Sequence, residues 1–262
     1  MRLIGTAASG LRAQQVAMDT IGNNLANVNT LGFKGSQVDF AEALSTVVSS
    51  GNTKAGGNTG ATALGVGSGV VYNAIGTDFQ QGDLTSTDSP LDLGINGAGF
   101  FQVKTQDGTT AYTRVGNFQV DGSGQLADRQ GNQLQPNITI PSGTTDLKVA
   151  TNGSITGVVA GVEKTLGQIS LVGFQNPEGL QKNADSLFVP TVNSGAPQLG
   201  QAGSTIGNQV LGMIRGQSLE QSNVDLATSM TDLIQVQRAY QLNARLISDG
   251  DQMWGTANSI RR

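Results

Sequence analysis

The chain has 262 residues and a formal net charge of -4 at pH 7, and it contains neither histidine nor cysteine. It therefore cannot form a disulfide, a thiolate nucleophile, a cysteine-based metal site or a histidine-based catalytic triad. Charged residues make up 13% of the chain, against about 25% in an ordinary globular domain. No basic tract stands out, so the sequence does not favour nucleic-acid binding. Together with 37 glycines, this composition predicts turn-rich β-structure or a chain that packs closely against other chains.

No segment approaches the run of about 18 apolar residues that a membrane-spanning helix needs, so we expect no membrane insertion. The N-terminal sequence MRLIGTAASGLRAQQ has a basic residue but no sustained apolar stretch. We therefore expect no cleaved signal peptide, and any export would use a route that does not need one.

The N-terminal segment carries apolar residues at alternating spacings of three and four, the pattern of a helix with a packed seam. Gly5, Gly10 and Gly22 each weaken an isolated helix by about 1 kcal/mol relative to alanine. Such a helix depends on packing partners for its stability. The predicted N-terminal seam consists of Ile4, Leu11, Met18, Ile21, Leu25 and Val28.

The C-terminal segment repeats this pattern after a predicted N-cap at Ser222–Asn223. Each stripe alone is most simply explained by ordinary core contact. Because the two helices lie at opposite ends of the chain, they could instead form a coiled-coil-like assembly device. The predicted C-terminal seam consists of Leu226, Met230, Leu233, Tyr240, Ala244 and Ile247.

Between Ser45 and Gly69 the chain is rich in Gly, Ser, Thr and Asn, which predicts a loop or extended excursion. It is either a flexible linker or a segment that folds against neighbouring subunits. From about residue 70 to 192, short β-type runs alternate with turn signals, which predicts an antiparallel β domain. Residues 200–221 are expected to connect the β domain back to the C-terminal helix and to contain one short strand.

The predicted fold class is therefore α+β, with the terminal helices paired and a mainly antiparallel β domain between them. The expected divisions are a helical core domain of residues 1–34 and 222–262, a connecting region of residues 35–70 and 203–221, and a β-rich outer domain of residues 71–202. The excursion at 45–69 belongs to the connecting region.

Candidate chemical sites are weak. Gly94, Gly97 and Gly99 form a GxxGxG pattern, but the strand-like FFQV follows it, whereas a phosphate loop needs a helix. We expect a tight turn there. Asp83, Asp88 and Asp92 are expected in turns and caps, although a glycosidase that uses two carboxylates stays an alternative. No catalytic residue, cofactor site or metal site is predicted.

Three blocks of sequence resemble the bacterial flagellar rod and hook family. They are IGNNLANVNTLGFK, LDLGINGAGFFQV with AYTRVGNFQVDGSGQL, and SLEQSNVDLATSMTDLIQVQRAYQLNARLISDGDQM. They occur in the family's order and cover essentially the whole chain. Within the family, the length and the excursion are most similar to the distal-rod protein, with a proximal-rod or hook subunit as the alternative. The first block holds the motif residues Asn23, Asn24, Asn27, Gly32 and Phe33.

The resemblance implies a non-enzymatic subunit of a helical tube that transmits motor torque to the hook. Its implied partners are further copies of itself, the proximal rod and hook proteins, the surrounding bushing rings and the flagellar type III export apparatus. Its implied place is the basal body, where it crosses the periplasm or cell wall. The excursion would stiffen the rod. A different class, a β-rich surface adhesin or carbohydrate-active protein, is the remaining alternative.

Two further expectations concern the ends of the chain. Residues 1–30 and 225–262 are expected to be disordered in the isolated monomer, since they contain many glycines and have no local core. Asn23, Asn24 and Asn27 lie off the seam and are expected to hydrogen-bond neighbouring helices. Gly32 suits a positive φ at the helix end, and Phe33 is expected to anchor the departing chain.

Overall fold

The computed structural model describes residues 2–43, 46–49, 64–207 and 209–260. The chain divides into two units. Unit 1 consists of Met1–Ala26, Ser36–Gly76 and Asp225–Arg262, and unit 2 of Asn27–Gly35 and Thr77–Val224. The α+β class is confirmed, with a helix toward each end of the chain and a mostly antiparallel β-rich middle. The pairing of the helices as a coiled coil stays a prediction, as do the three predicted domain boundaries.

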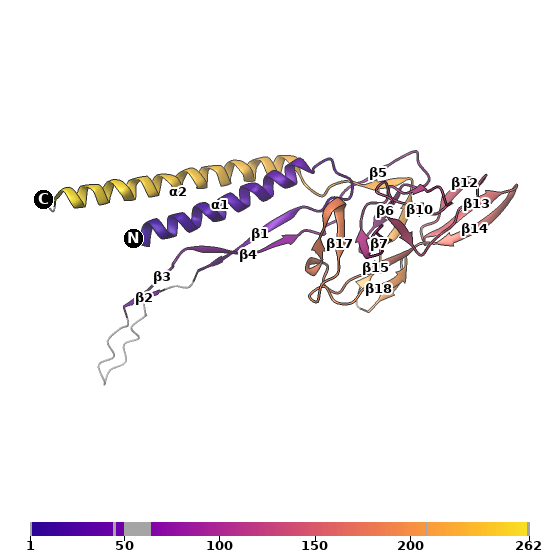
Figure 1. Ribbon diagram of the computed structural model, residues 1–262, viewed down its shortest axis with the longest axis horizontal. Helices are drawn as coiled ribbons and strands as arrows, with labels where there is room; N and C mark the ends of the chain where they lie inside the picture. The colour runs from indigo at the N-terminus through magenta and orange to yellow at the C-terminus, as the bar shows by residue number, and fades with distance from the viewer. Residues whose placement is uncertain (1, 44–45, 50–63, 208, 261–262) are drawn as a thin grey trace, which may run out of the picture. The chain divides into compact units, whose positions relative to one another are not determined.

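Unit 1 contains both long helices, and they run antiparallel alongside each other (Figure 1). Neither is long and apolar enough to cross a membrane, judged over the described residues. The strands of this unit form two pairs, β1 with β4 and β2 with β3. The elements are α1 (Arg2–Ala26), β1 (Ser36–Glu42), β2 (Thr46–Ser49), β3 (Leu64–Val66), β4 (Val70–Thr77) and α2 (Leu226–Ile260).

The predicted excursion is only partly described. Its two ends form β2 and β3, which pair antiparallel with Thr46 opposite Val66. Ser45 and residues 50–63 lie outside the described residues.

Asp225 caps the start of α2. Its carboxylate accepts a 2.6 Å hydrogen bond from the Thr228 amide, which satisfies one of the free N–H groups of the first turn. This bond lowers the pKa of the Asp225 carboxyl. The predicted cap at Ser222–Asn223 is therefore wrong. A carboxylate one residue before Leu226 provides the same chemistry at the true helix start.

Unit 2 is built from short strands, and every pairing whose register is described between named strands is antiparallel. A nine-stranded sheet has the order β16-β17-β8-β7-β11-β10-β9, with β15 joining β7 to β18. A three-stranded sheet has the order β12-β13-β14, and further pairs join β19 to β20, β21 to β6 and β22 to β5. The elements are β5 (Leu84–Ser86), β6 (Leu93–Asn96), β7 (Phe100–Lys104), β8 (Thr110–Thr113), β9 (Gln119–Val120), β10 (Leu126–Ala127), β11 (Gln133–Gln135), β12 (Thr145–Val149), β13 (Ser154–Val159), β14 (Val162–Gln168), β15 (Ser170–Gly173), the 3-10 turn η1 (Pro177–Gly179), β16 (Gln181–Lys182), the 3-10 turn η2 (Ala184–Ser186), β17 (Leu187–Val189), β18 (Gln198–Gln201), β19 (Thr205–Ile206), β20 (Gln209–Val210), β21 (Met213–Gly216) and β22 (Ser218–Glu220).

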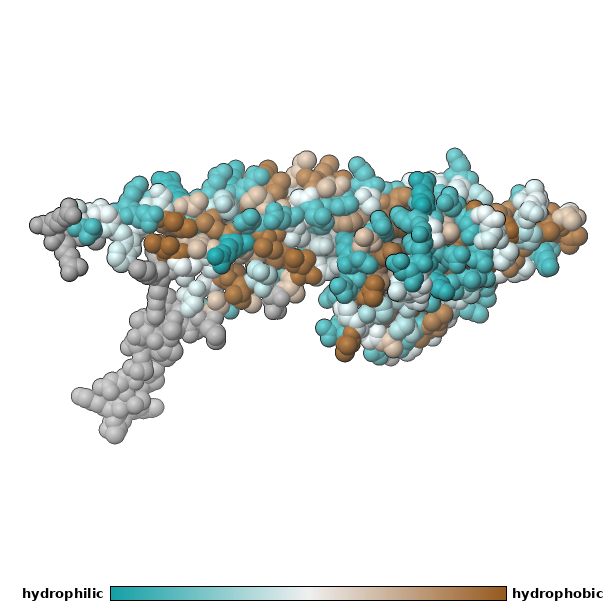
Figure 2. Space-filling model, in the orientation of Figure 1, coloured by the Kyte–Doolittle hydropathy of each residue, from teal (hydrophilic) through white to brown (hydrophobic). Residues whose placement is uncertain are grey.

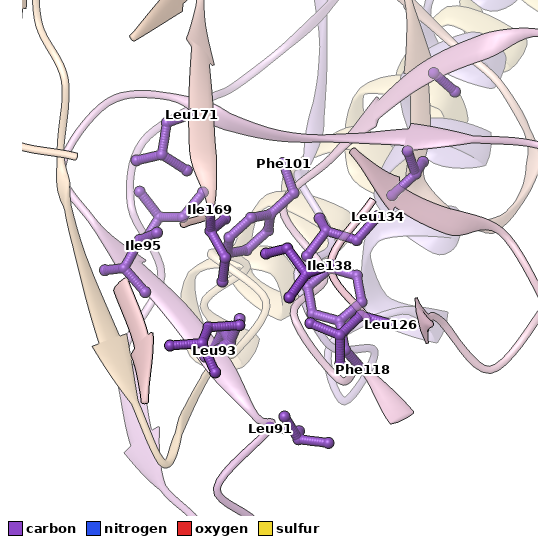
Figure 3. Packing of buried hydrophobic residues seen from close by; sticks show 14 of the residues in the cluster. Leu91, Leu93, Ile95, Phe101, Phe118, Leu126, Leu134, Ile138, Ile169 and Leu171 are labelled. Atoms are coloured by element: carbon purple, nitrogen blue, oxygen red, sulfur yellow. The ribbon is translucent and has the colours of Figure 1, made fainter. Parts of the chain in front are cut away.

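The core of unit 2 lies on both faces of β7, because successive side chains of a strand point to opposite sides. Phe101 belongs to the larger aliphatic cluster shown in Figure 3 and stacks edge-on with Phe118. Phe100 belongs to a separate aromatic cluster, where it meets Phe174 and Phe188 edge-on. Phe100 and Phe101 therefore place β7 between the two hydrophobic clusters.

The GxxGxG pattern forms a tight turn into β7, as predicted. Gly97 has φ 113°, and a Cβ at this position would lie 2.9 Å from the Gly212 Cα. The expectation of one strand in residues 200–221 is wrong, since β19, β20, β21 and β22 lie there. Gln217 has φ 52°, and it separates β21, which pairs with β6, from β22, which pairs with β5.

Candidate assembly surfaces

Helix α1 presents small side chains to its surroundings in unit 1. Ala7, Ala13 and Ala17 are its buried residues among those described. A Cβ on Gly10 would lie 2.9 Å from the Asn243 side-chain amide of α2. Small residues at spacings of three and four allow close helix approach, so this row forms the inner face of α1. Most members of this row are not large apolar residues, so the predicted seam does not include them, although their spacing is visible in the sequence.

The predicted N-terminal seam lies beside this row. Its members on α1 are all partly exposed, and Val28 lies two residues past the end of the helix, in a turn. The partly exposed members are Ile4, Leu11, Met18, Ile21 and Leu25.

The predicted C-terminal seam is mostly exposed. Leu233 and Ile247 are partly covered, whereas Leu226, Met230, Tyr240 and Ala244 are exposed. The less exposed positions of α2 instead follow another row at spacings of three and four, which includes Asn243 against α1. This row includes Ser229, Leu233, Val236, Ala239, Asn243, Ile247 and Gly250.

Unit 1 therefore leaves much apolar surface uncovered. Most of the exposed large hydrophobic side chains described lie on α2 and on the β1–β4 pair. Figure 2 shows hydrophobic patches along the helical part of the surface. Exposed apolar patches of this kind mark sites of protein–protein contact. Those outside the predicted seam are Phe40, Val70, Val71, Tyr72, Ile75, Ile234, Leu242, Leu246, Met253, Trp254 and Ile260.

Two of the motif asparagines, Asn24 and Asn27, make hydrogen bonds to nearby residues of the same chain. The Asn24 amide donates to the Ser36 carbonyl at 2.8 Å and accepts from the Ser36 amide at 2.9 Å. This two-way bridge joins the end of α1 to the start of β1. Asn27 accepts a hydrogen bond from the Thr30 hydroxyl in the turn that follows, and Asn23 is exposed on α1.

Gly32 and Phe33 lie in unit 2. Gly32 has φ 61°, and a Cβ there would meet the Val115 side chain at 2.9 Å and the Val115 amide nitrogen at 3.0 Å. Both the backbone conformation and the close approach therefore require glycine. Phe33 is buried, and the Lys182 ammonium lies 3.7 Å from the centre of its ring, a cation–π contact.

A buried charge cluster follows this motif directly, and the sequence analysis missed it. Lys34 and Glu220 are joined by a 2.7 Å ion pair, and Arg114 lies 3.4 Å from the other carboxylate oxygen. All three side chains are buried. The Glu220 carboxylate also accepts from the Gly82 amide at 3.0 Å, and Lys34 donates to the Gln80 carbonyl at 2.6 Å.

The cluster holds together the segments of unit 2 that border unit 1 in the sequence. Burial lowers the pKa of Lys34 below its usual 10.5, while the Glu220 charge opposes this shift. Burial likewise lowers the pKa of Arg114. Asn223 reinforces the arrangement, since its side chain accepts from the Gly35 amide and donates to the Asp78 carbonyl. We name Lys34, Arg114 and Glu220 the buried charge cluster.

Within the described ranges, no group of three or more His, Cys, Asp or Glu side chains is placed to hold a metal ion. Asp83 and Asp92 have backbone roles. The Asp83 carbonyl accepts from the Gln221 amide, and the Asp92 carbonyl accepts from the Ser218 amide.

Comparison with known proteins gives three family matches in the order of the chain. "Flagella basal body rod protein" matches residues 4–34, "Flagellar hook protein FlgE/F/G D1 domain" matches residues 94–157, and "Flagellar basal body rod FlgEFG protein C-terminal" matches residues 215–260. These matches cover α1 with the motif, the central β region and α2.

Similar curated proteins extend over the full length. The flagellar basal-body rod protein FlgG of Caulobacter vibrioides is 39% identical, with 100% of both chains covered. FlgG of Borreliella burgdorferi is 38% identical over 100% of this chain and 99% of its own. The flagellar hook-basal body complex protein FlhP of Bacillus subtilis is 32% identical over 100% of both chains. The chain therefore belongs to the flagellar basal-body rod protein family.

Proposed function

We propose that this chain is a non-enzymatic structural subunit of the distal flagellar rod, which polymerises into a rigid helical tube and transmits motor torque to the hook. Full-length similarity to FlgG proteins supports the rod. The observation that carries self-assembly is the concentration of exposed apolar side chains on unit 1, chiefly on α2 and β4. Burial of such surface between copies is the main favourable term in protein association.

The finer parts of the proposal concern the roles of segments. The terminal helices would pair in a coiled-coil-like manner and line the tube, and the β-rich outer domain would surround them. The excursion at 45–69 would pack along adjacent copies and stiffen the rod. The predicted N- and C-terminal seams would supply contacts between copies, because the side chains of both seams are partly or fully exposed in the single chain.

The proposed partners are further copies of the chain, the proximal rod and hook proteins, and the surrounding bushing rings. The chain would reach the basal body through the type III export apparatus, without signal cleavage, and would cross the periplasm or cell wall there. A marginal helix pair that is stabilised only on assembly suits export as an unassembled monomer.

The test compares two exposed apolar positions. Met230→Asp places a charge on α2 in unit 1, where the side chain is 48% exposed, and Val162→Asp does so on β14 in unit 2, where it is 67% exposed. In a strain lacking the chain, the Val162→Asp variant should restore rods, hooks and motility, whereas Met230→Asp should not. Normal rods with Met230→Asp, or motility without the chain, would contradict the proposal.

A further inference from the structure

Unit 1 contains an apolar groove of about 660 Å³. Its walls come from the first half of α1, from the β1 and β4 strands, and from the middle of α2. None of the described residues that line it is charged. The walls include Ala7, Gly10, Ala13, Phe40, Val70 and Leu246.

Small residues make up much of the groove lining. Gly10, Gly67 and Gly69 line it together with Ala7 and Ala13. Phe40 is 45% exposed and Leu246 is 48% exposed, so apolar wall groups face water. The walls are uncharged and mainly apolar, with Thr6, Gln14 and Asn243 as their polar members, so they favour an occupant that is uncharged and carries apolar side chains.

The end of α2 is uncharged and carries large apolar side chains, and among the described residues it has no partner helix. Gly10 lies against Asn243, and the helices are antiparallel (Figure 1). With about 1.5 Å of rise per residue, Arg2 lies near Asp251, so residues 252–260 extend about 13 Å past α1. This segment, which we name the α2 overhang, has the sequence QMWGTANSI and carries no charge.

The α2 overhang continues the row that faces α1. Asn243, Ile247 and Gly250 are covered positions of that row, and Trp254 follows Gly250 at the same helical spacing. Beyond the first residue of α1, the side chains of α2 are no longer covered by that helix. Trp254 is 54% exposed and Met253 is 60% exposed.

We propose that the α2 overhang of one copy, centred on Met253 and Trp254, seats in the apolar groove of a second copy. The inference rests on the proposed self-assembly and names its contact. The overhang cannot fill its own groove, since α2 is one continuous helix whose residues Asn243 and Leu246 line that groove. Groove and overhang are different surfaces of one unit, so each contact leaves a free groove and a free overhang. Such heterologous contacts propagate into an open helical polymer when the rotation between copies does not close a ring.

Cross-linking tests this contact directly, because the chain has no cysteine. Gln14 lines the groove and lies about 20 Å along the helices from Met253 of the same chain. This exceeds the roughly 7 Å limit for a disulfide. Oxidation of the assembled Gln14→Cys/Met253→Cys variant should therefore give a ladder of covalent dimers, trimers and larger species, while each single variant should give none.

The outcomes separate the two proposals. A polymer that forms normally without a ladder would overturn the groove contact and leave the proposed function standing. Dimers from Met253→Cys alone would also overturn it, since overhangs would then meet each other. Failure of the unmodified chain to polymerise, in solution and on the basal body, would refute the proposed function itself.

A second measurement needs no cysteine. Trp254 is the one tryptophan in the sequence, so its fluorescence should shift to shorter wavelength on assembly. Val70→Asp should place a charge on the groove wall, where the Val70 side chain is 38% exposed, and should raise the critical concentration about tenfold, as expected for loss of one buried apolar contact. Val162→Asp, the same change at an exposed position of unit 2, is the matched control. Equal assembly of the two variants would contradict the inference.

Discussion

Glu220 is the single anion of the buried charge cluster, and its neutralisation tests what the cluster contributes. In Glu220→Gln, the side chain keeps its size but loses its charge. Lys34 and Arg114 would then remain buried with no carboxylate between them. A buried cation without a partner is costly, because the protein interior solvates charge poorly.

The expected loss follows from the contacts of the carboxylate. One oxygen lies 2.7 Å from the Lys34 ammonium and 3.0 Å from the Gly82 amide, and the other lies 3.4 Å from Arg114. Breaking a buried ion pair by removing one partner costs about 3–5 kcal/mol. Lys34→Met should cost less, about 1–3 kcal/mol, because Glu220 keeps Arg114 and the Gly82 amide as partners.

Native-state hydrogen exchange of the full chain measures this loss within unit 2. The amides of β7 report the opening of that unit, since the strand lies between the two cores. Glu163→Gln, on the exposed strand β14, changes the charge equally and should leave exchange at β7 within about 0.5 kcal/mol. Protection of β7 in Glu220→Gln that matches Glu163→Gln would refute the reasoning. So would a larger loss in Lys34→Met than in Glu220→Gln.

Three further predictions concern local structure and assembly. Gly32→Ala should destabilise unit 2 by more than Gly108→Ala, since both have positive φ but only Gly32 meets other atoms; equal unfolding midpoints in urea would contradict this. The pKa of Asp225 is lowered in the folded chain, so the cap stabilises α2 fully at pH values above the ordinary carboxyl pKa of 3.8. This stabilisation is lost as the pH falls through the lower pKa of the folded state. Circular dichroism of the polymer should therefore show acid loss of helix in the wild type that is absent in Asp225→Asn, a neutral cap; identical acid curves would refute it. Deletion of residues 45–69 should give a more flexible polymer by electron microscopy, and a straight, rigid rod would reject the stiffening role.

Local patterns predicted much of the fold. The 3–4 spacings located both helices, and glycine-containing turn signals located the β region, because both signals arise from neighbouring residues. The pairing of β15 with β7, or of β22 with β5, depends on contacts between distant segments. No spacing in the sequence encodes them directly.

The candidate surfaces show the same limit. Lys34 and Glu220 are 186 residues apart, so nothing local marks them as an ion pair. The inner face of α1 was missed for another reason, because Ala13 and Ala17 contribute little hydrophobicity. Asp225 was visible as a capping residue, but Ser222 and Asn223 offered the same chemistry a few residues earlier.

The central claim is that this chain forms the distal rod through contacts between copies of unit 1. Electron microscopy of purified hook–basal bodies tests it most directly, with a small epitope inserted in the turn between β13 and β14 of unit 2, where Gly161 is exposed. The account predicts label along the rod segment directly below the hook, and loss of that segment with Met230→Asp. Label on the hook, on the cell surface away from the basal body, or nowhere on the rod would contradict it.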